Sequence, residues 1–115
     1  MTNATIYCVD ELLAKAGKGR EVLSRYREEY APAATARGMT LDRELVSPPM
    51  WLDEQANRLL ITWRIAGAAA WWGVSSQSRF DPSVAAFWQS IDPLLESRNR
   101  YFASADADVA ELSDV

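Results

Sequence analysis

Four side chains in the sequence are the chosen candidates for assisting a reaction. The phenol of Tyr7 can donate a proton to an oxygenated substrate or accept one, and the guanidinium of Arg64 can stabilise an enolate or a phenolate. The carboxylates of Asp10 and Glu44 are candidate bases. Each residue also has a structural alternative, which is core packing for the tyrosine, pairing at a sheet surface for the arginine, and solvation or ion pairing for the acids. The spacing of the four does not dictate one mechanism.

The sequence contains no histidine. This excludes a Ser-His-Asp triad, a Cys-His pair, a histidine-ligated zinc ion and a haem held by a proximal histidine within this chain. The glycines of "KAGKGR", residues 15–20, lack the spacing of a phosphate-binding loop and indicate a turn into a helix. A metal site made of carboxylates alone remains open but has no motif behind it, and we expect no metal ion and no tightly bound cofactor.

Paired tryptophans stand in the segment "AGAAAWWGVSS", residues 66–76. On a helix, neighbouring residues point about 100° apart, so Trp71 and Trp72 cannot both face the sheet. The small residues around them leave room beside the large rings. The two indoles therefore either fill the core and an interface, or line a cavity for a flat, apolar ligand. The residues that we expect to bind such a ligand are Tyr26, Tyr30, Trp63, Trp71, Trp72, Ser75 and Trp88.

Length and composition indicate one globular domain. The chain has 115 residues, of which 49% are hydrophobic, which is enough for a core and argues against disorder. Charged residues interrupt every apolar run before the ~20 residues that a membrane-spanning helix needs. The start "MTNATIY" lacks the pattern of a signal peptide, and the single cysteine, Cys8, suits a reducing compartment. We expect a cytoplasmic protein without a membrane partner.

The charge is unevenly distributed along the chain. The sequence has 12 basic and 16 acidic residues, and four of the acids, Asp106, Asp108, Glu111 and Asp114, lie near its end. The rest of the chain is therefore neutral and shows no basic stripe, so nucleic acid is not an expected partner. We expect a single domain over residues 1–104 and an acidic, mobile tail over residues 105–115.

The hydrophobic periodicity predicts alternating strands and helices. A helix over residues 20–38 is indicated by apolar residues three and four apart, and Asp81 followed by Pro82 predicts the start of another. The predicted strands are 4–11, 39–46, 58–65 and 97–104, and the predicted helices are 20–38, 67–77 and 82–92. This order predicts an α+β, ferredoxin-like βαββαβ fold, with a four-stranded antiparallel sheet and helices on one face.

The other face of such a sheet would be partly apolar. Strict alternation places Tyr7, Val9, Glu44, Val46, Leu60 and Arg64 on it. Leaving this face in water is unfavourable, and pairing with a second copy would bury it. We therefore expect a homodimer that forms an α/β barrel through the sheet.

Three segments resemble the dimeric α/β-barrel superfamily, and within it the NIPSNAP-like and antibiotic-biosynthesis-monooxygenase-like proteins. They are "GKGREVLSRYREEYAPAATARG", "LLITWRI" and "FDPSVAAFWQSIDPLLESRNRYF". The resemblance implies a substrate cavity between sheet and helices. It also implies a range of activities that includes cofactor-free monooxygenation, polyketide cyclisation, isomerisation and haem degradation. Related proteins often carry a histidine where this chain has Ile61, so the resemblance does not transfer an acid–base role to that position.

Three hypotheses follow from the residues and the resemblance. The first is an enzyme that acts on a hydrophobic, oxygenated substrate, such as an aromatic polyketide or a terpenoid, by cofactor-independent cyclisation, isomerisation or monooxygenation. The second is a protein that binds the same kind of ligand without chemistry. The third is a purely structural dimer. A cavity with polar groups facing into it distinguishes the first two hypotheses from the third.

Overall fold

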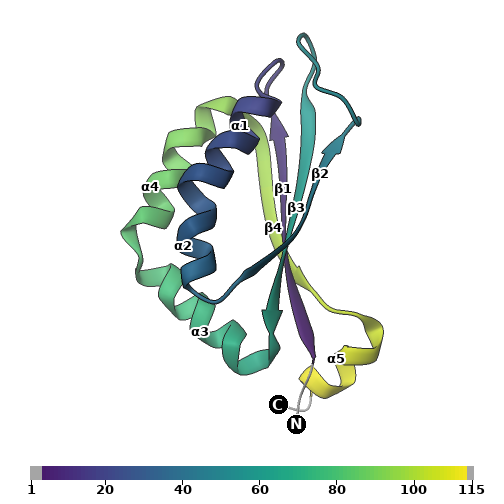
Figure 1. Ribbon diagram of the computed structural model, residues 1–115, viewed down its shortest axis with the longest axis vertical. Coiled ribbons are helices and arrows are strands. Elements are labelled where there is room, and N and C mark those ends of the chain that lie inside the picture. Colours follow the sequence, from purple (N-terminus) through teal and green to yellow (C-terminus); the bar gives the residue numbers. More distant parts are fainter. Residues whose placement is uncertain (1–3, 114–115) are drawn as a thin grey trace.

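A twisted four-stranded sheet forms the centre of the computed structural model, which describes residues 4–113. Its strands are β1 (Thr5–Ala14), β2 (Thr40–Ser47), β3 (Asn57–Ala66) and β4 (Leu95–Ala103). They lie in the order β2-β3-β1-β4, and all neighbours are antiparallel. Helices α1 to α4 cover one face (Figure 1). The predicted fold class and all four strands are thus confirmed.

The predicted helix over residues 20–38 is present and contains a wide turn. It consists of α1 (Gly19–Arg25), the π-helical segment η1 (Tyr26–Tyr30) and α2 (Ala31–Ala36). Proline lacks a backbone N–H, and Pro32 stands at the start of α2, directly after the wide turn. The segment ends at Gly38, whose φ of 107° favours glycine.

The second helical region consists of α3 (Gly67–Phe80), α4 (Pro82–Ile91) and the short η2 (Asp92–Leu94). Asp81 caps α4 as predicted, because its carboxylate accepts a hydrogen bond from the backbone N–H of Ser83 at 2.9 Å. None of the helices in the described part of the chain has the length and apolarity that crossing a membrane requires.

The acidic end of the chain contains a helix that the sequence did not predict. This helix, α5 (Asp106–Ser113), lies on the side of the sheet opposite α1–α4 (Figure 1). Asp108 accepts a hydrogen bond from the backbone N–H of Thr5, and Leu112 packs against the hydrophobic core. The division into a domain and a mobile tail remains a prediction.

Side chains alternate between the two faces of the sheet. On the helix side lie Asp10 in β1 and Trp63 in β3, and both are buried. Tyr7, Leu60 and Arg64 lie on the other, open face, as expected. The core consists mainly of the helix-side residues of β1 and β3 and the apolar residues of α1, η1 and α4.

A β-bulge in β2 places two residues on the face of the sheet opposite to the predicted one. The register against β3 shifts between Leu41 and Arg43, which reverses the alternation beyond it. Glu44 therefore stands opposite Ile61, and Val46 packs against the core on the helix side. Placing these two residues on the open face was wrong, because uninterrupted alternation was assumed.

Candidate functional site

A buried carboxylate, Asp10, lies between the sheet and the helices. Its side chain points to the helix side of β1, and the residue is 1% exposed. Arg100 of β4 binds it with two nitrogens, Nε to Oδ1 at 2.6 Å and Nη2 to Oδ2 at 2.7 Å. Tyr26 donates its hydroxyl proton to Oδ2 at 2.7 Å. A buried charge needs such partners, and here three charge-assisted hydrogen bonds supply them.

Aromatic residues extend this centre. Trp63 donates its indole N–H to the hydroxyl oxygen of Tyr26 at 2.6 Å. The hydroxyl oxygen of Tyr30 accepts hydrogen bonds from Arg100 Nη2 at 2.7 Å and from Arg37 Nη2 at 3.3 Å. The ring centroids of Tyr26 and Tyr30 lie 4.9 Å apart, because the two residues are four positions apart in the wide turn η1.

Burial raises the pKa of three groups in this region. It raises the pKa of Tyr26 well above its ordinary value, and the neighbouring carboxylate of Asp10 raises it further. Burial also raises the pKa of Tyr30, although Arg100 opposes this shift. The pKa of the Cys8 thiol rises to about 12, mainly through burial. Both phenols are therefore neutral at physiological pH and can donate hydrogen bonds, but they are poor bases.

The buried centre meets solvent at a small cleft between β4 and α4. The cleft has a volume of about 180 Å³. Its polar lining includes Asp10, Arg98 and Arg100, and the indole of Trp88 contributes an aromatic wall. The guanidinium carbons of Arg98 and Arg100 lie 4.6 and 5.6 Å from the centre of that indole, within the range of cation–π attraction. We call this space the arginine cleft.

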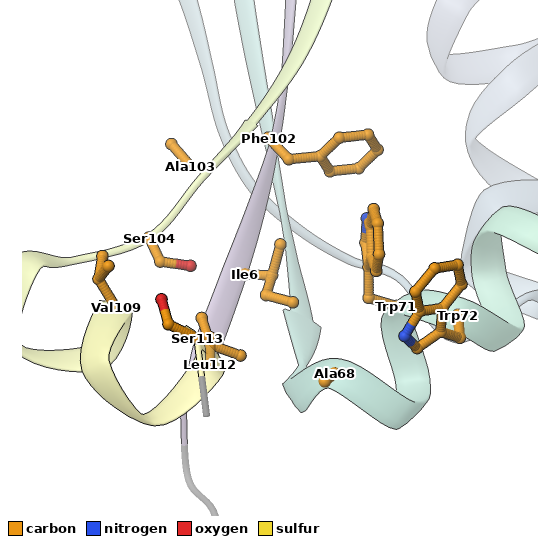
Figure 2. A pocket seen from close by; sticks show the side chains of 10 residues that line it. All are labelled: Ile6, Ala68, Trp71, Trp72, Phe102, Ala103, Ser104, Val109, Leu112 and Ser113. Carbon is orange, nitrogen blue, oxygen red and sulfur yellow. The ribbon is translucent and has the colours of Figure 1, made fainter. Parts of the chain in front are cut away.

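A larger cavity lies where α3, the ends of β1 and β4, and α5 meet. It has a volume of about 420 Å³, and we call it the tryptophan cavity. Figure 2 shows Trp71 and Trp72 of α3 on one side of it and α5 on the other. Among residues 4–113, its lining contains no ionisable side chain. The residues are Ile6, Ala68, Trp71, Trp72, Phe102, Ala103, Ser104, Val109, Leu112 and Ser113.

The two indoles have different environments, as the helical spacing predicted. The rings of Trp71 and Trp72 lie 4.7 Å apart in an edge-to-face arrangement. Trp71 packs against the core and against Phe102, whereas Trp72 is 63% exposed. The indole nitrogen of Trp71 is buried and has no hydrogen-bond partner among residues 4–113. Such a donor is uncommon in folded proteins.

Not all predicted site residues come together. Tyr7 and Arg64 lie on the open face, where the Arg64 guanidinium is 3.7 Å from the carboxylate of Asp42. Glu44 accepts a hydrogen bond from Arg27 at 2.5 Å. Neither these three residues nor Ser75 line the arginine cleft or the tryptophan cavity. Asp10, Tyr26, Tyr30, Trp63 and Trp88 form one contiguous group, of which only Asp10 and Trp88 line the arginine cleft.

The sequence analysis missed the residues of β4. Arg98, Arg100 and Phe102 stand opposite Leu12, Asp10 and Cys8 of β1, so all three point to the helix side. Their spacing of two along a strand was the available signal. This spacing alone did not indicate a site, because nothing in the sequence showed that a buried carboxylate would lie across from Arg100. Within the described residues, no cluster of histidine, cysteine or acidic side chains could hold a metal ion.

Solved structures with the same architecture identify the fold. A NIPSNAP family protein of unknown function from Agrobacterium tumefaciens matches with a TM-score of 0.68 at 13% identity, over 91% of each chain. An uncharacterized NIPSNAP domain protein from Burkholderia xenovorans matches with a TM-score of 0.68 at 20% identity, over 89% of this chain and 95% of that one. The fold is that of the NIPSNAP family proteins.

One further solved structure with a similar fold has a name that states an activity. A candidate antibiotic biosynthesis monooxygenase from Nitrosomonas europaea matches with a TM-score of 0.61 at 8% identity, over 92% of this chain and 94% of that one. No protein-family model matches the sequence, and no curated protein does. At identities this low, the likeness establishes the fold, and the expected resemblance is confirmed at that level.

Proposed function

We propose that this protein binds a flat, hydrophobic, oxygenated small molecule in the tryptophan cavity. The observation that carries the proposal is an apolar cavity of about 420 Å³ walled by three aromatic rings. Ligand pockets typically occupy ~300–1,000 Å³ and combine apolar walls with few polar groups. The indole N–H of Trp71 is buried and lacks an acceptor within residues 4–113, so an oxygen atom of the ligand would supply that acceptor only if the ring turned toward the cavity.

Binding without chemistry is the function that this cavity supports best. The lining that the described residues supply contains no acid, base or arginine, so a proton transfer inside it would need a group from outside that lining. The polar groups available are the hydroxyls of Ser104 and Ser113 and the indole N–H groups. Of these, Ser104 already donates to the backbone oxygen of Thr5 at 2.8 Å.

Tryptophan fluorescence tests this proposal. Aromatic polyketides, terpenoids and steroids would be titrated into the protein, with Trp71→Phe, Trp72→Phe and Trp51→Phe variants in parallel. We expect saturable quenching by one chemical class, weakened in a Trp71 or Trp72 variant and retained in the Trp51 variant, since Trp51 lies outside the cavity. Quenching that is equal in all three variants would place the ligand elsewhere, and no quenching by any class would leave the indoles as packing.

Catalysis is the second candidate function, and a different observation favours it. A buried carboxylate with three hydrogen bonds, beside two neutral phenols and the arginine cleft, resembles the clusters found at active sites. Under this proposal, the protein carries out a cofactor-independent cyclisation, isomerisation or monooxygenation. Incubation of the ligand found by fluorescence with the protein in air, followed by mass spectrometry, tests it. A product formed in proportion to protein would support catalysis, and an unchanged ligand would refute it for that ligand.

The assembly and the location are also part of this proposal. Tyr7, Leu60 and Tyr101 give the open face of the sheet an apolar character, which supports a homodimer formed through it. A cytoplasmic location is supported by Cys8, which is a buried free thiol.

A further inference from the structure

The arginine cleft has no part in the binding function proposed above, yet it contains two guanidinium groups. Arg98 and Arg100 project from the same side of the edge strand β4, two residues apart. Both lie over the indole of Trp88, which holds them beside each other. Two arginines on one aromatic surface place their hydrogen-bond donors side by side.

Arg100 retains a free donor although it is ion-paired. Its Nε and Nη2 atoms are bound to Asp10, and Nη2 also reaches Tyr30. Nη1 makes no hydrogen bond within residues 4–113 and is not among the buried unpaired atoms. The contacts to Asp10 therefore fix the orientation of the guanidinium and leave the Nη1 donor available at the cleft.

Arg98 is held more weakly. Its Nε donates to Asp92 at 2.8 Å, and the two side chains are 42% and 47% exposed. Exposed ion pairs contribute little free energy, so a ligand can compete for this guanidinium. The charged groups that line the cleft are Arg98, Arg100 and Asp10, and Asp92 balances Arg98 while their ion pair holds. A ligand that displaces Asp92 from Arg98 would meet one uncompensated positive charge, which one negative charge on the ligand would neutralise.

From this geometry, we infer that the arginine cleft binds a small organic monocarboxylate. Planar guanidinium groups match the planar carboxylate, and here Arg98 can donate from both of its Nη atoms while Arg100 donates from Nη1 alone. The cleft of about 180 Å³ suits a molecule with one ring, because an apolar protein cavity of ~150 Å³ accommodates benzene. The tryptophan cavity shares no lining residue with the cleft, so the two sites can be tested independently.

Benzoate is the probe that we would use, with benzamide as its neutral isostere. Protein labelled with ¹⁵N at tryptophan is titrated with each compound, and the indole N–H signal of Trp88 is followed. We expect saturable shifts of this signal with benzoate, at least tenfold weaker binding of benzamide, and weaker benzoate binding at higher salt.

Variants locate the carboxylate. Arg98→Gln should weaken benzoate binding about tenfold, whereas the control Arg79→Gln should not, because Arg79 is exposed on α3 and does not line the cleft. Arg100 is not replaced here, since its loss would leave Asp10 unpaired and could unfold the protein. The inference is overturned if benzoate leaves the Trp88 signal unchanged, if benzamide binds as well as benzoate, or if Arg98→Gln binds benzoate like the unmodified protein.

Discussion

Replacement of Arg100 by glutamine tests the physical basis of the buried centre. Asp10 is 1% exposed and receives two hydrogen bonds from Arg100, at 2.6 and 2.7 Å. Removal of one partner of a buried ion pair costs about 3–5 kcal/mol, because the other charge stays buried without compensation. Since Arg100 itself is 28% exposed, we expect a loss near the lower end, about 3 kcal/mol. Urea denaturation, followed by far-ultraviolet circular dichroism, measures it.

A double-mutant cycle separates this effect from a general loss of packing. Asp10→Asn together with Arg100→Gln removes both charges, so the double variant should be more stable than the sum of the two single losses predicts, by about 2 kcal/mol. Arg98→Gln is the matched control on the same strand, and its exposed ion pair should be worth less than about 1 kcal/mol. Equal losses for Arg98→Gln and Arg100→Gln, or an additive double variant, would refute the reasoning.

Three further predictions concern packing, pH and assembly. Gly19→Ala should destabilise the protein, because a Cβ there would lie 2.9 Å from a side-chain carbon of Asn57. Gly73→Ala lies in open space on α3 and should stabilise the protein by about 0.5–1 kcal/mol in urea denaturation. A more stable Gly19→Ala than Gly73→Ala variant would contradict this. Burial raises the pKa of Tyr26, so above pH ~10 the unfolded chain releases a proton that the folded chain keeps. The free energy of unfolding should therefore fall by about 1.4 kcal/mol per pH unit for this group. A Tyr26→Phe variant should show a shallower slope, and an unchanged slope would contradict the assignment. Light scattering should give twice the chain mass of 12.9 kDa for the protein and the monomer mass for Leu60→Glu on the open face, and a monomeric unmodified protein would exclude the dimer.

Local patterns in the sequence were sufficient to predict the architecture. Alternation and helical periodicity indicated the four strands and the main helices, because each element buries one regular face. The Asp81–Pro82 pair predicted the start of α4 for a local reason, the capping of free N–H groups. The π-helical turn and the bulge after Leu41 were not predicted, because both depend on tertiary packing rather than on a local signal. The bulge alone moved Glu44 to the other face.

The candidate sites could be predicted only in part. The sequence left open whether Trp71 and Trp72 pack in the core and an interface or line a cavity; both lie at the tryptophan cavity, whose opposite wall comes from α5 in the acidic tail. Asp10 was a candidate base, whereas its partner Arg100 lies 90 residues away, and the antiparallel pairing of β1 with β4 alone brings them together. Such a pair follows from the register, which a single sequence does not display.

The central claim is that the tryptophan cavity binds a hydrophobic, oxygenated molecule. Its most direct test is the ¹⁵N spectrum of tryptophan-labelled protein, in which the five indole N–H signals are followed as the quenching ligand is added. The account predicts the largest shifts for Trp71 and Trp72 and little change for Trp63, whose N–H is bonded to Tyr26 in the core. Unchanged Trp71 and Trp72 signals at a ligand concentration that saturates quenching would contradict it.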